Sequence, residues 1–596
     1  MKNENLKILR EEMKKEGLSA FIFPSADAHN SEYTPAHWHG REWISGFSGS
    51  AGTAVVTMDK AALWTDSRYF IAAAEMLQDT EFELMKDGLP STPTISKWLG
   101  HVLSSIDGAE VGVDGFCYTQ HEAQAMRTAL RHEGGITLRT NLDILSRIWK
   151  DRPQIPQNKV FMLPEEYTGS SAKEKLHNLR KELSKQHVCG ILVSALDEIA
   201  WLLNLRGSDA HCTPVFVAYL LLEQEKTTLY IDSHKVDDDV ARYLHEQGVG
   251  IDDYTHIEKA LHSYTQYNIL LDSHNTSCTL YEKVKCQEII DRPSPIARMK
   301  AVKNETELKG IRNAMLKDGI ALTKLCRWLK TTVQEDNAST SELSVDEQLL
   351  TFKKEQPLFH GLSFDTIVGY QEHGAIVHYE ATEKTNIPIK PNGLLLVDCG
   401  SQYLDGTTDI TRTFAVGSLT KEEKDICTTV LKAHIRLAKA RWTAGTTGTQ
   451  LDILARGVVW DAGYHYGHGT GHGVGCFLSC HEGPQRIRNQ YSDEPLVPGM
   501  IVSNEPGIYV EGKYGCRWEN LLLVVADGKG VQGEDFYKFE YLSLCPFDKE
   551  TINVDMLTAD EKDWVNTYHQ KVYETLSPYL DSLHSTWLKT ACAPIN

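Results

Sequence analysis

The sequence predicts an α/β (α+β) protein with three domains. Its 596 residues correspond to roughly three to four domains of about 150 residues each. Short apolar runs typical of strands alternate with amphipathic stretches typical of helices. Two segments in the first half also repeat one order of motifs. One fold is therefore expected twice, before a different and larger third domain.

The first half contains two distant copies of one α/β unit. Three motifs recur in order: Ser25-Ala26-Asp27 as Ser194-Ala195-Leu196-Asp197, Gly49-Ser50 as Gly207-Ser208, and Asp66-Ser67 as Asp232-Ser233. Each copy also contains an amphipathic helical stretch, at 122–134 and 172–186. Polar, proline-containing segments at 150–159 and 291–307 indicate linkers. The expected domains are therefore residues 1–156, 157–303 and 304–596.

The third domain is expected to begin with a long helix, from Glu305 to about Leu329. Asn304 is a suitable N-cap, and Glu307 stands at capping-box spacing. A second helix is expected within 422–441. Apolar runs predict strands at 393–400, 408–416, 500–510 and 519–526.

Composition excludes some classes of partner. The net charge is −20, from 61 basic and 81 acidic residues, which disfavours nucleic acid or an anionic membrane as the main partner. The first 21 residues predict a charged amphipathic helix, and no apolar run is long enough to cross a membrane. The 13 cysteines are odd in number and form no CxxC pair, which fits reduced thiols in the cytoplasm.

The segment "VDCGSQYLDGTTDITRT" brings carboxylates into an apolar region. Three aspartates follow the apolar residues 394–397: Asp398, Asp405 and Asp409. A buried carboxylate is costly unless it is paired or binds a metal. In a hairpin, Asp398 faces Asp409 across a four-residue loop, or Thr413 across a tight turn at 405–406. The sequence leaves the register open; the first one would need a cation between the two carboxylates.

Further candidate ligands follow along the chain. In "GHGTGHGVG", alternating glycines favour an extended segment with one shared face for His468, Thr470, His472 and Val474. His481 lies in "HEGP", Glu505 precedes a Pro-Gly turn, and Glu519 begins an apolar strand. Oxygen ligands with imidazole suit Mn, Co, Fe or Zn better than copper. Four carboxylates suit two ions that share bridging ligands.

Taken singly, these residues have simpler interpretations. An aspartate in a hairpin is usually a turn or hydrogen-bonding residue, which is the expectation for Asp405. Glu505 could cap a helix or pair with Lys513. Two thiols and an imidazole at Cys476, Cys480 and His481 would make an incomplete zinc site. His37 and His39 are expected at the surface, without carboxylate neighbours.

The motifs in combination are more specific. "DCGSQYLDGTTDITRT", "HGTGHGVG", "NEPG" and "RWEN" resemble the pita-bread metallopeptidases. "SEYTPAHWHGREWISGFSGSAGTA", "ALWTDSRYF", "DEIAWLLNLRGSD", "GAIVHY" and "FEYLSLCPFD" extend the resemblance over the whole chain, to the long three-domain aminopeptidases P. The resemblance implies two creatinase-like N-terminal domains, a pita-bread catalytic domain and a homodimer. It also implies removal of the first residue from peptides whose second residue is proline.

The resemblance further implies a ligand set for two divalent ions, usually Mn²⁺, with Co²⁺, Zn²⁺ or Fe²⁺ as alternatives. Asp398 would hold one ion, and His472 with Glu505 the other. Asp409 and Glu519 would bridge the two ions. All five matching positions are present in this sequence.

The resemblance also implies roles in catalysis and peptide binding. Glu505 would exchange protons, and His481 would stabilise the oxyanion. His378 would bind substrate or shuttle protons, His468 would line the proline site, and Arg517 would frame the pocket. A prolidase, which cleaves Xaa-Pro dipeptides, and a non-catalytic peptide-binding scaffold are the alternatives. Cys399 and Trp518 depart from the usual motif residues.

Overall fold

The computed structural model describes residues 2–335 and 340–596. These residues form two compact units. One unit comprises the chain up to Glu165 together with Ser170–Ala297, and the other comprises Glu166–Gly169 and Arg298–Asn596. Among the described residues, no helix is both long and apolar enough to cross a membrane.

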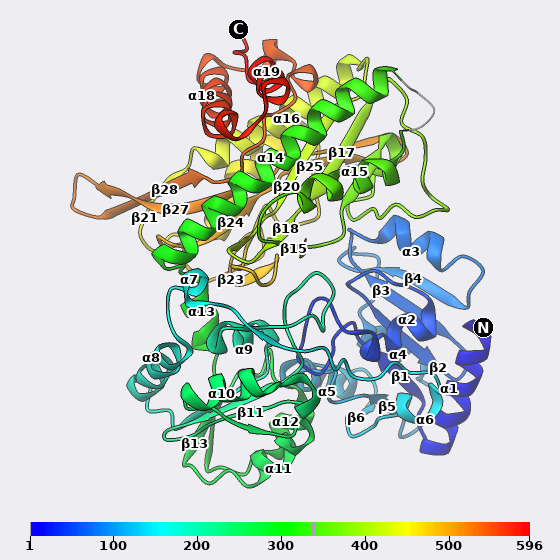
Figure 1. The fold of residues 1–596 in the computed structure, drawn as a ribbon. Coiled ribbons are helices and arrows are strands. Elements are labelled where there is room, and N and C mark those ends of the chain that lie inside the picture. The colour runs from blue at the N-terminus through cyan, green and yellow to red at the C-terminus, as the bar shows by residue number, and fades with distance from the viewer. Residues whose placement is uncertain (1, 336–339) are drawn as a thin grey trace. The chain divides into compact units, whose positions relative to one another are not determined.

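The first sheet of the N-terminal unit has the strand order β4-β3-β2-β1-β5-β6 (Figure 1). Its strands are β1 (Ala20–Phe23), β2 (Thr53–Thr57), β3 (Ala61–Thr65), β4 (Phe82–Lys86), β5 (Glu110–Val113) and β6 (Thr137–Arg139). Successive residues of β1 point to opposite faces. Phe21 packs with α1 (Lys2–Glu16) and α2 (Gly40–Ser45), whereas Ile22 packs with α4 (Ile95–Val102) and α5 (Gln120–His132). Helices therefore cover both faces.

The second sheet of this unit has the equivalent strand order, β12-β11-β10-β8-β13-β14. Its strands are β8 (Gly190–Val193), β10 (Tyr219–Glu223), β11 (Thr227–Tyr230), β12 (Gly250–Asp252), β13 (Asn268–Leu271) and β14 (Glu288–Asp291). The strand β8 is antiparallel to β10 and parallel to β13, just as β1 is antiparallel to β2 and parallel to β5. This matching topology is what a repeated domain predicts.

The C-terminal unit is built around a six-stranded sheet and a three-stranded sheet (Figure 1). The larger sheet contains, in order, β21 (Arg441–Thr443), β28 (Asp535–Tyr541), β27 (Asn520–Lys529), β24 (Ile501–Asn504), β22 (Gly471–Gly473) and β23 (Glu482–Ile487). The smaller sheet contains β16 (Ile367–Tyr370), β17 (Leu394–Cys399) and β20 (Ile410–Ala415). Between β17 and β20 along the chain, the short strands β18 (Ser401–Tyr403) and β19 (Gly406–Thr407) pair with β15 (Phe359–Leu362) in a separate small sheet. Between β24 and β27, β25 (Gly507–Val510) and β26 (Tyr514–Arg517) pair with each other.

Helices cover both sheets of this unit. Their bounds are α14 (Glu305–Glu335), α15 (Glu342–Lys354), α16 (Lys421–Ala438), α17 (Gly448–Asp461), α18 (Ala559–Leu576) and α19 (Ser582–Ala591). The helices α14 and α15 pack on the three-stranded sheet, and α16 to α19 pack with β24, β27 and β28. Asn304 and Glu307 form the predicted capping box, with reciprocal bonds of 2.9 and 3.0 Å. The helix α14 continues past Leu329 because Val333 still packs in the core.

Both predicted hairpin registers are wrong. Asp398 pairs with Thr411, and Tyr403 pairs with Gly406, so the two-residue turn is Leu404-Asp405. Asp405 is a turn residue as predicted, but it is also buried, where Lys317 donates to it at 2.5 Å. This register places Asp409 diagonally across from Asp398 on one face of the hairpin, rather than directly opposite.

Candidate metal centre

The five predicted ligands lie at the ends of strands from both sheets. Asp398 is in β17, Asp409 precedes β20, and His472 is in β22. The last pair of β24 and β27 is Asn504 with Asn520, so Glu505 and Glu519 leave that sheet at the same edge. The amide of Glu519 donates to the Thr411 carbonyl at 3.1 Å, which joins the two sheets at this point.

The structure brings all five side chains together. Their potential ligand atoms form three overlapping groups, within each of which the atoms lie within 4.8 Å of one another. The groups are Asp398 with Asp409 and Glu519, His472 with Glu505 and Glu519, and Asp409 with His472 and His481. Asp409, His472 and Glu519 each belong to two groups, but only the two carboxylates have a second oxygen with which to contact a second ion. Shared membership is what a bridging carboxylate requires.

His472 is oriented for a metal. Its Nδ1 bonds the Gly473 carbonyl at 2.9 Å, which fixes the ring proton on that nitrogen in the neutral tautomer. Its Nε2 lies 3.4 Å from both Asp409 Oδ2 and Glu505 Oε1. The nitrogen that carries the lone pair therefore faces the carboxylates.

The carboxylates carry more negative charge than such a buried site favours. Burial, together with Asp409 and Glu505, raises the pKa of Glu519 well above its usual range. Burial also raises the pKa values of Glu505 and Asp398. Although burial opposes it, the adjacent imidazoles of His472 and His481, together with the Cys480 thiol, lower the pKa of Asp409. Among the described residues, Asp398 Oδ1 is buried without a hydrogen-bond partner. The donor set therefore fits divalent cations, which would neutralise these oxygens.

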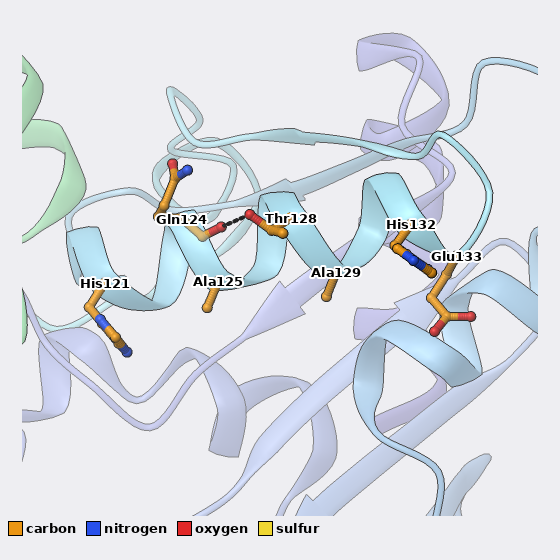
Figure 2. A pocket seen from close by; sticks show the side chains of 7 residues that line it. All are labelled: His121, Gln124, Ala125, Thr128, Ala129, His132 and Glu133. Carbon is orange, nitrogen blue, oxygen red and sulfur yellow. Dashed lines mark hydrogen bonds between the residues drawn. The ribbon is translucent and has the colours of Figure 1, made fainter.

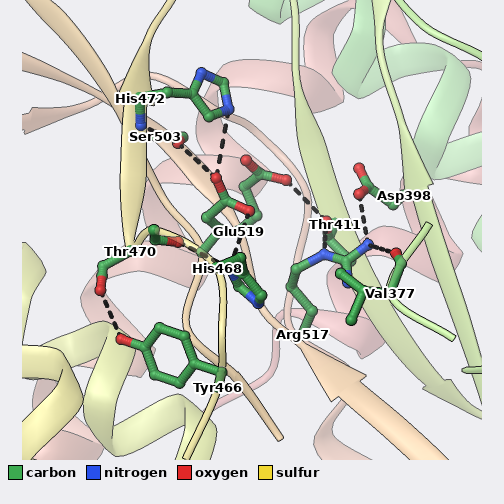
Figure 3. A network of polar contacts seen from close by, with 12 residues as sticks. Val377, Asp398, Thr411, Tyr466, His468, Thr470, His472, Ser503, Arg517 and Glu519 are labelled. Carbon is green, nitrogen blue, oxygen red and sulfur yellow. Dashed lines mark hydrogen bonds and ion pairs between the residues drawn. The ribbon is translucent and has the colours of Figure 1, made fainter. Parts of the chain in front are cut away.

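Three neighbours that sequence reasoning missed hold the carboxylates in place. The Thr411 hydroxyl donates to Glu519 Oε2 at 2.8 Å (Figure 3). The Ser503 hydroxyl donates to Glu505 Oε1 at 3.1 Å. Each lies two residues along the sequence from a predicted ligand, Asp409 or Glu505, and this spacing is the signal that could have identified it. The Cys480 thiol donates to Asp409 Oδ2 at 3.2 Å and carries no comparable signal.

Arg517 links the acidic cluster to the histidines. It donates from Nη2 to Asp398 Oδ2 at 2.6 Å and from Nη1 to the Tyr509 hydroxyl at 2.8 Å. A hydrogen bond of 2.8 Å then joins that hydroxyl to His468 Nε2. Tyr509, also missed in the sequence, thus connects two residues expected at the peptide-binding site.

The other predicted histidines lie around the same centre. The ring of His481 stands edge-on to that of His472, with centroids 4.3 Å apart. His378 follows Val377, whose carbonyl accepts from Arg517 Nη2 at 3.5 Å (Figure 3). All the predicted site residues therefore come from segments that meet at this centre.

Several simpler interpretations are wrong. Lys513 pairs with Glu422 rather than with Glu505. The Thr470 hydroxyl, expected on the same face as His468 and His472, donates to Asp452 Oδ1 at 2.6 Å and not to a candidate ligand. Within the described chain, no cluster of three potential ligands joins Cys476 and Cys480 to His481. His39 does have a carboxylate neighbour, Glu42, at 3.0 Å, because one turn of helix separates them.

A hollow of about 530 Å³ in the N-terminal unit is not a competing site. It runs along α5 and is lined by that helix and the residue after it (Figure 2): His121, Gln124, Ala125, Thr128, Ala129, His132 and Glu133. Within the described residues, none of these belongs to a group of three potential metal ligands. The metal centre therefore remains the candidate site.

The fold and the carboxylate-rich site together define a metallopeptidase of the pita-bread class. Models of the creatinase/prolidase N-terminal domain match residues 6–139 and 151–307. The model of metallopeptidase family M24 matches residues 309–526, and the C-terminal region of that peptidase matches 535–595. The predicted architecture, with two creatinase-like domains before a pita-bread domain, is thereby confirmed.

Full-length relatives specify the family. The chain is 39% identical to Xaa-Pro aminopeptidase 1 of Dictyostelium discoideum, covering 98% of this chain and 96% of the relative. It is 40% identical to a probable Xaa-Pro aminopeptidase P of Sordaria macrospora, covering 99% of each. The crystal structure of X-prolyl aminopeptidase from Caenorhabditis elegans, described as a cytosolic enzyme with a di-nuclear active site, matches with a TM-score of 0.95 and 31% identity over the whole of both chains. The chain belongs to the Xaa-Pro aminopeptidases of metallopeptidase family M24.

Proposed function

We propose that this metallopeptidase removes the first residue from peptides whose second residue is proline. The observation that carries this proposal is the convergence of four carboxylates and His472, within a chain that matches Xaa-Pro aminopeptidases from end to end. An Xaa-Pro bond is a tertiary amide without an N–H, so general peptidase sites that bind that N–H reject it. A dedicated enzyme class is therefore needed.

Five residues are proposed to hold two divalent ions. Asp398 would hold one ion, His472 and Glu505 would hold the other, and Asp409 and Glu519 would be shared by both. The overlapping ligand groups and the di-nuclear site described for the C. elegans enzyme support this assignment. Mn²⁺ is the proposed metal, and Co²⁺, Zn²⁺ and Fe²⁺ are compatible with the same oxygen and imidazole ligands. Bound divalent ions supply Lewis acidity, which lowers the pKa of water and polarises a carbonyl group.

The protein's own residues move protons and orient the peptide. Glu505 accepts a proton from the attacking water and returns it to the leaving proline nitrogen. His481 donates to the oxyanion of the tetrahedral intermediate. His378 binds the peptide, and His468 lines the proline site. Arg517 frames the pocket through its ion pair with Asp398.

Hydrolysis of Arg-Pro-Pro tests the proposed function. We expect free arginine from Arg-Pro-Pro, and none from Arg-Ala-Ala or the dipeptide Arg-Pro. The activity should be lost with a chelator and restored by Mn²⁺. Cleavage of Arg-Pro alone would make the enzyme a prolidase. If the protein binds metal but cleaves none of the three peptides, the metal centre is supported and the proposed substrate class is contradicted. A protein that binds no metal would instead be a non-catalytic scaffold.

Domain boundaries, cytoplasmic location and a homodimer complete the proposal. The two N-terminal domains are assigned to residues 1–156 and 157–303, and the catalytic domain to 304–596; the repeated strand order supports the first two. The cytosolic description of the C. elegans enzyme supports the location. On α17, Ile453 and Trp460 are each 50% exposed, which offers an apolar surface for a second copy. Light scattering of Trp460→Glu should report a monomer if that surface forms the dimer.

A further inference from the structure

A buried carboxylate outside the metal centre gathers one loop of the catalytic unit. Glu342 is the first residue of α15, and its side chain is fully buried. It accepts four hydrogen bonds from the loop 370–387. The donors are the Tyr370 amide at 2.9 Å, His373 Nδ1 at 2.8 Å, the Tyr379 hydroxyl at 3.0 Å and the Ile387 amide at 3.3 Å.

These four bonds close the loop on itself. The first and last donors, Tyr370 and Ile387, are 17 residues apart in sequence (387 − 370) and meet at one carboxylate. Between them, the rings of His373 and Tyr379 stack with centroids 4.3 Å apart. The N-terminus of α15 also favours the negative charge of Glu342. A single side chain therefore sets the geometry of the whole loop.

The closed loop carries His378 to the metal centre. The ring of Tyr379 packs with Ile367 and Leu396, and Leu396 lies two residues before Asp398 in β17. On the other side of His378, the Val377 carbonyl accepts a hydrogen bond from Arg517, the partner of Asp398. The residues on both sides of His378 are thus fixed, one by Glu342 and the other by Arg517.

We propose that Glu342 is a positioning residue for the peptidase reaction, which holds His378 at the peptide-binding site through the hydrogen bonds to Tyr379 and His373. This inference rests on the proposed function, because His378 is assigned to substrate binding there. Among the described residues, the hydrogen-bond donors to Glu342 include none of the five proposed metal ligands. Its effect on catalysis passes through the loop.

Substitution of Glu342 by Gln tests the contacts with little change in shape. All four partners of Glu342 are donors, whereas a carboxamide presents one accepting oxygen and one NH₂ donor. Glu342→Gln therefore cannot keep the full set, and we expect kcat/KM to fall about tenfold, since displacement of a binding group by an ångström has effects of this order or larger. Tyr379→Phe loses one hydrogen bond to Glu342, and its kcat/KM should be about threefold below that of the wild type. Glu347→Gln, an exposed change on the same helix, should match the wild type.

A double-mutant cycle separates positioning from simple destabilisation. On a His378→Ala background, Glu342→Gln should reduce kcat/KM by less than about twofold, because the residue it positions is absent. An equal loss on both backgrounds would overturn the proposal. Metal content should stay at the wild-type level, and trypsin should cut after the exposed Lys384 faster in Glu342→Gln than in Glu347→Gln.

The outcomes also distinguish this proposal from the proposed function. A wild-type enzyme that fails to cleave Arg-Pro-Pro contradicts the proposed function. A wild-type enzyme that cleaves it, with Glu342→Gln and Tyr379→Phe both equal to Glu347→Gln, contradicts the role of Glu342 alone. If Glu342→Gln does not fold, the same cycle with Tyr379→Phe and His378→Ala decides the question.

Discussion

Two buried glutamates in the catalytic unit differ in the cations around them. Glu482 is 3% exposed, and it lies 2.9 Å from Lys300 Nζ and 2.8 Å from Lys303 Nζ. Glu519 is 2% exposed, and it accepts a hydrogen bond from the neutral hydroxyl of Thr411. Two carboxylates with the same burial thus have opposite surroundings.

The difference appears in their protonation. Although burial opposes it, the two lysines lower the pKa of Glu482. Burial, Asp409 and Glu505 raise the pKa of Glu519 well above its usual range. Burial alone therefore does not identify a functional carboxylate. A carboxylate neutralised by the chain's own lysines is structural, whereas a cluster of them without such neutralisation needs cations from outside.

The largest effect is expected where a bridging ligand is removed. Glu519→Gln offers a single accepting oxygen and cannot bridge two ions. We expect no more than one Mn²⁺ per chain and a loss in kcat/KM of about a thousandfold or more, equivalent to about 4 kcal/mol. Plasma mass spectrometry of the loaded protein and hydrolysis of Arg-Pro-Pro measure the two effects. Retention of two ions with near-normal activity would remove Glu519 from the ligand set.

Removal of one of the lysines that neutralise Glu482 should lower stability without loss of metal, the reverse of what is expected for Glu519→Gln. Lys303→Met leaves Glu482 with one lysine, and breaking a buried ion pair costs about 3–5 kcal/mol of stability. The free energy of unfolding, measured by urea denaturation, should fall by this amount while the bound metal stays at two ions. Lys309→Met, an exposed change nearby on α14, is the control. Loss of metal without loss of stability would show that the lysines serve the metal centre.

Buried histidines extend the comparison to bases. Burial lowers the pKa of His569 to about 3, and the Phe547 amide donates to its Nε2 at 3.1 Å. Because the folded pKa lies below the unfolded value of about 6.5, its contribution to stability is complete above pH 6.5 and is lost as the pH falls toward 3. With chelator present, wild-type stability should fall by up to about 1.4 kcal/mol per pH unit more than that of His569→Gln.

Urea denaturation at about pH 7.5, 6 and 5 measures this difference in slope. The chelator removes any contribution from metal release. The remaining difference in slope between the two proteins is then due to the proton that His569 binds on unfolding. His434, whose pKa burial also lowers to about 3, is present in both proteins and cancels. If the free energy of unfolding falls with pH equally in the wild type and in His569→Gln, protonation of His569 does not destabilise the folded protein.

The sequence predicted the fold and ligands where the signal is local. A carboxylate at one end of an apolar strand identified Asp398 and Glu519 as candidate ligands, and the repeated motifs matched two sheets with one strand order. The hairpin register was missed because the turn at Asp405 is stabilised by Lys317, 88 residues away. The contacts of Glu342 span 28 to 45 residues. Contacts between residues so far apart in the sequence depend on how the folded elements pack, so they produce no periodic pattern in the sequence.

The smallest effect should come from the thiol beside the metal centre. The Cys480 thiol donates to Asp409 Oδ2 at 3.2 Å, whereas the Cys476 thiol faces the Asp405 carbonyl at 3.7 Å. Groups that orient a metal ligand typically change metal affinity by about 10–100-fold when removed. A thiol is a weak donor, so we expect an effect at the low end of this range. Cys480→Ala should bind Mn²⁺ about tenfold more weakly than the wild type, and Cys476→Ala should bind it with unchanged affinity. Equilibrium dialysis measures both. A serine hydroxyl can also donate, so Cys480→Ser should bind Mn²⁺ with nearly the affinity of the wild type. If Cys480→Ser and Cys480→Ala bind Mn²⁺ equally, the hydrogen bond to Asp409 has no part in holding the metal.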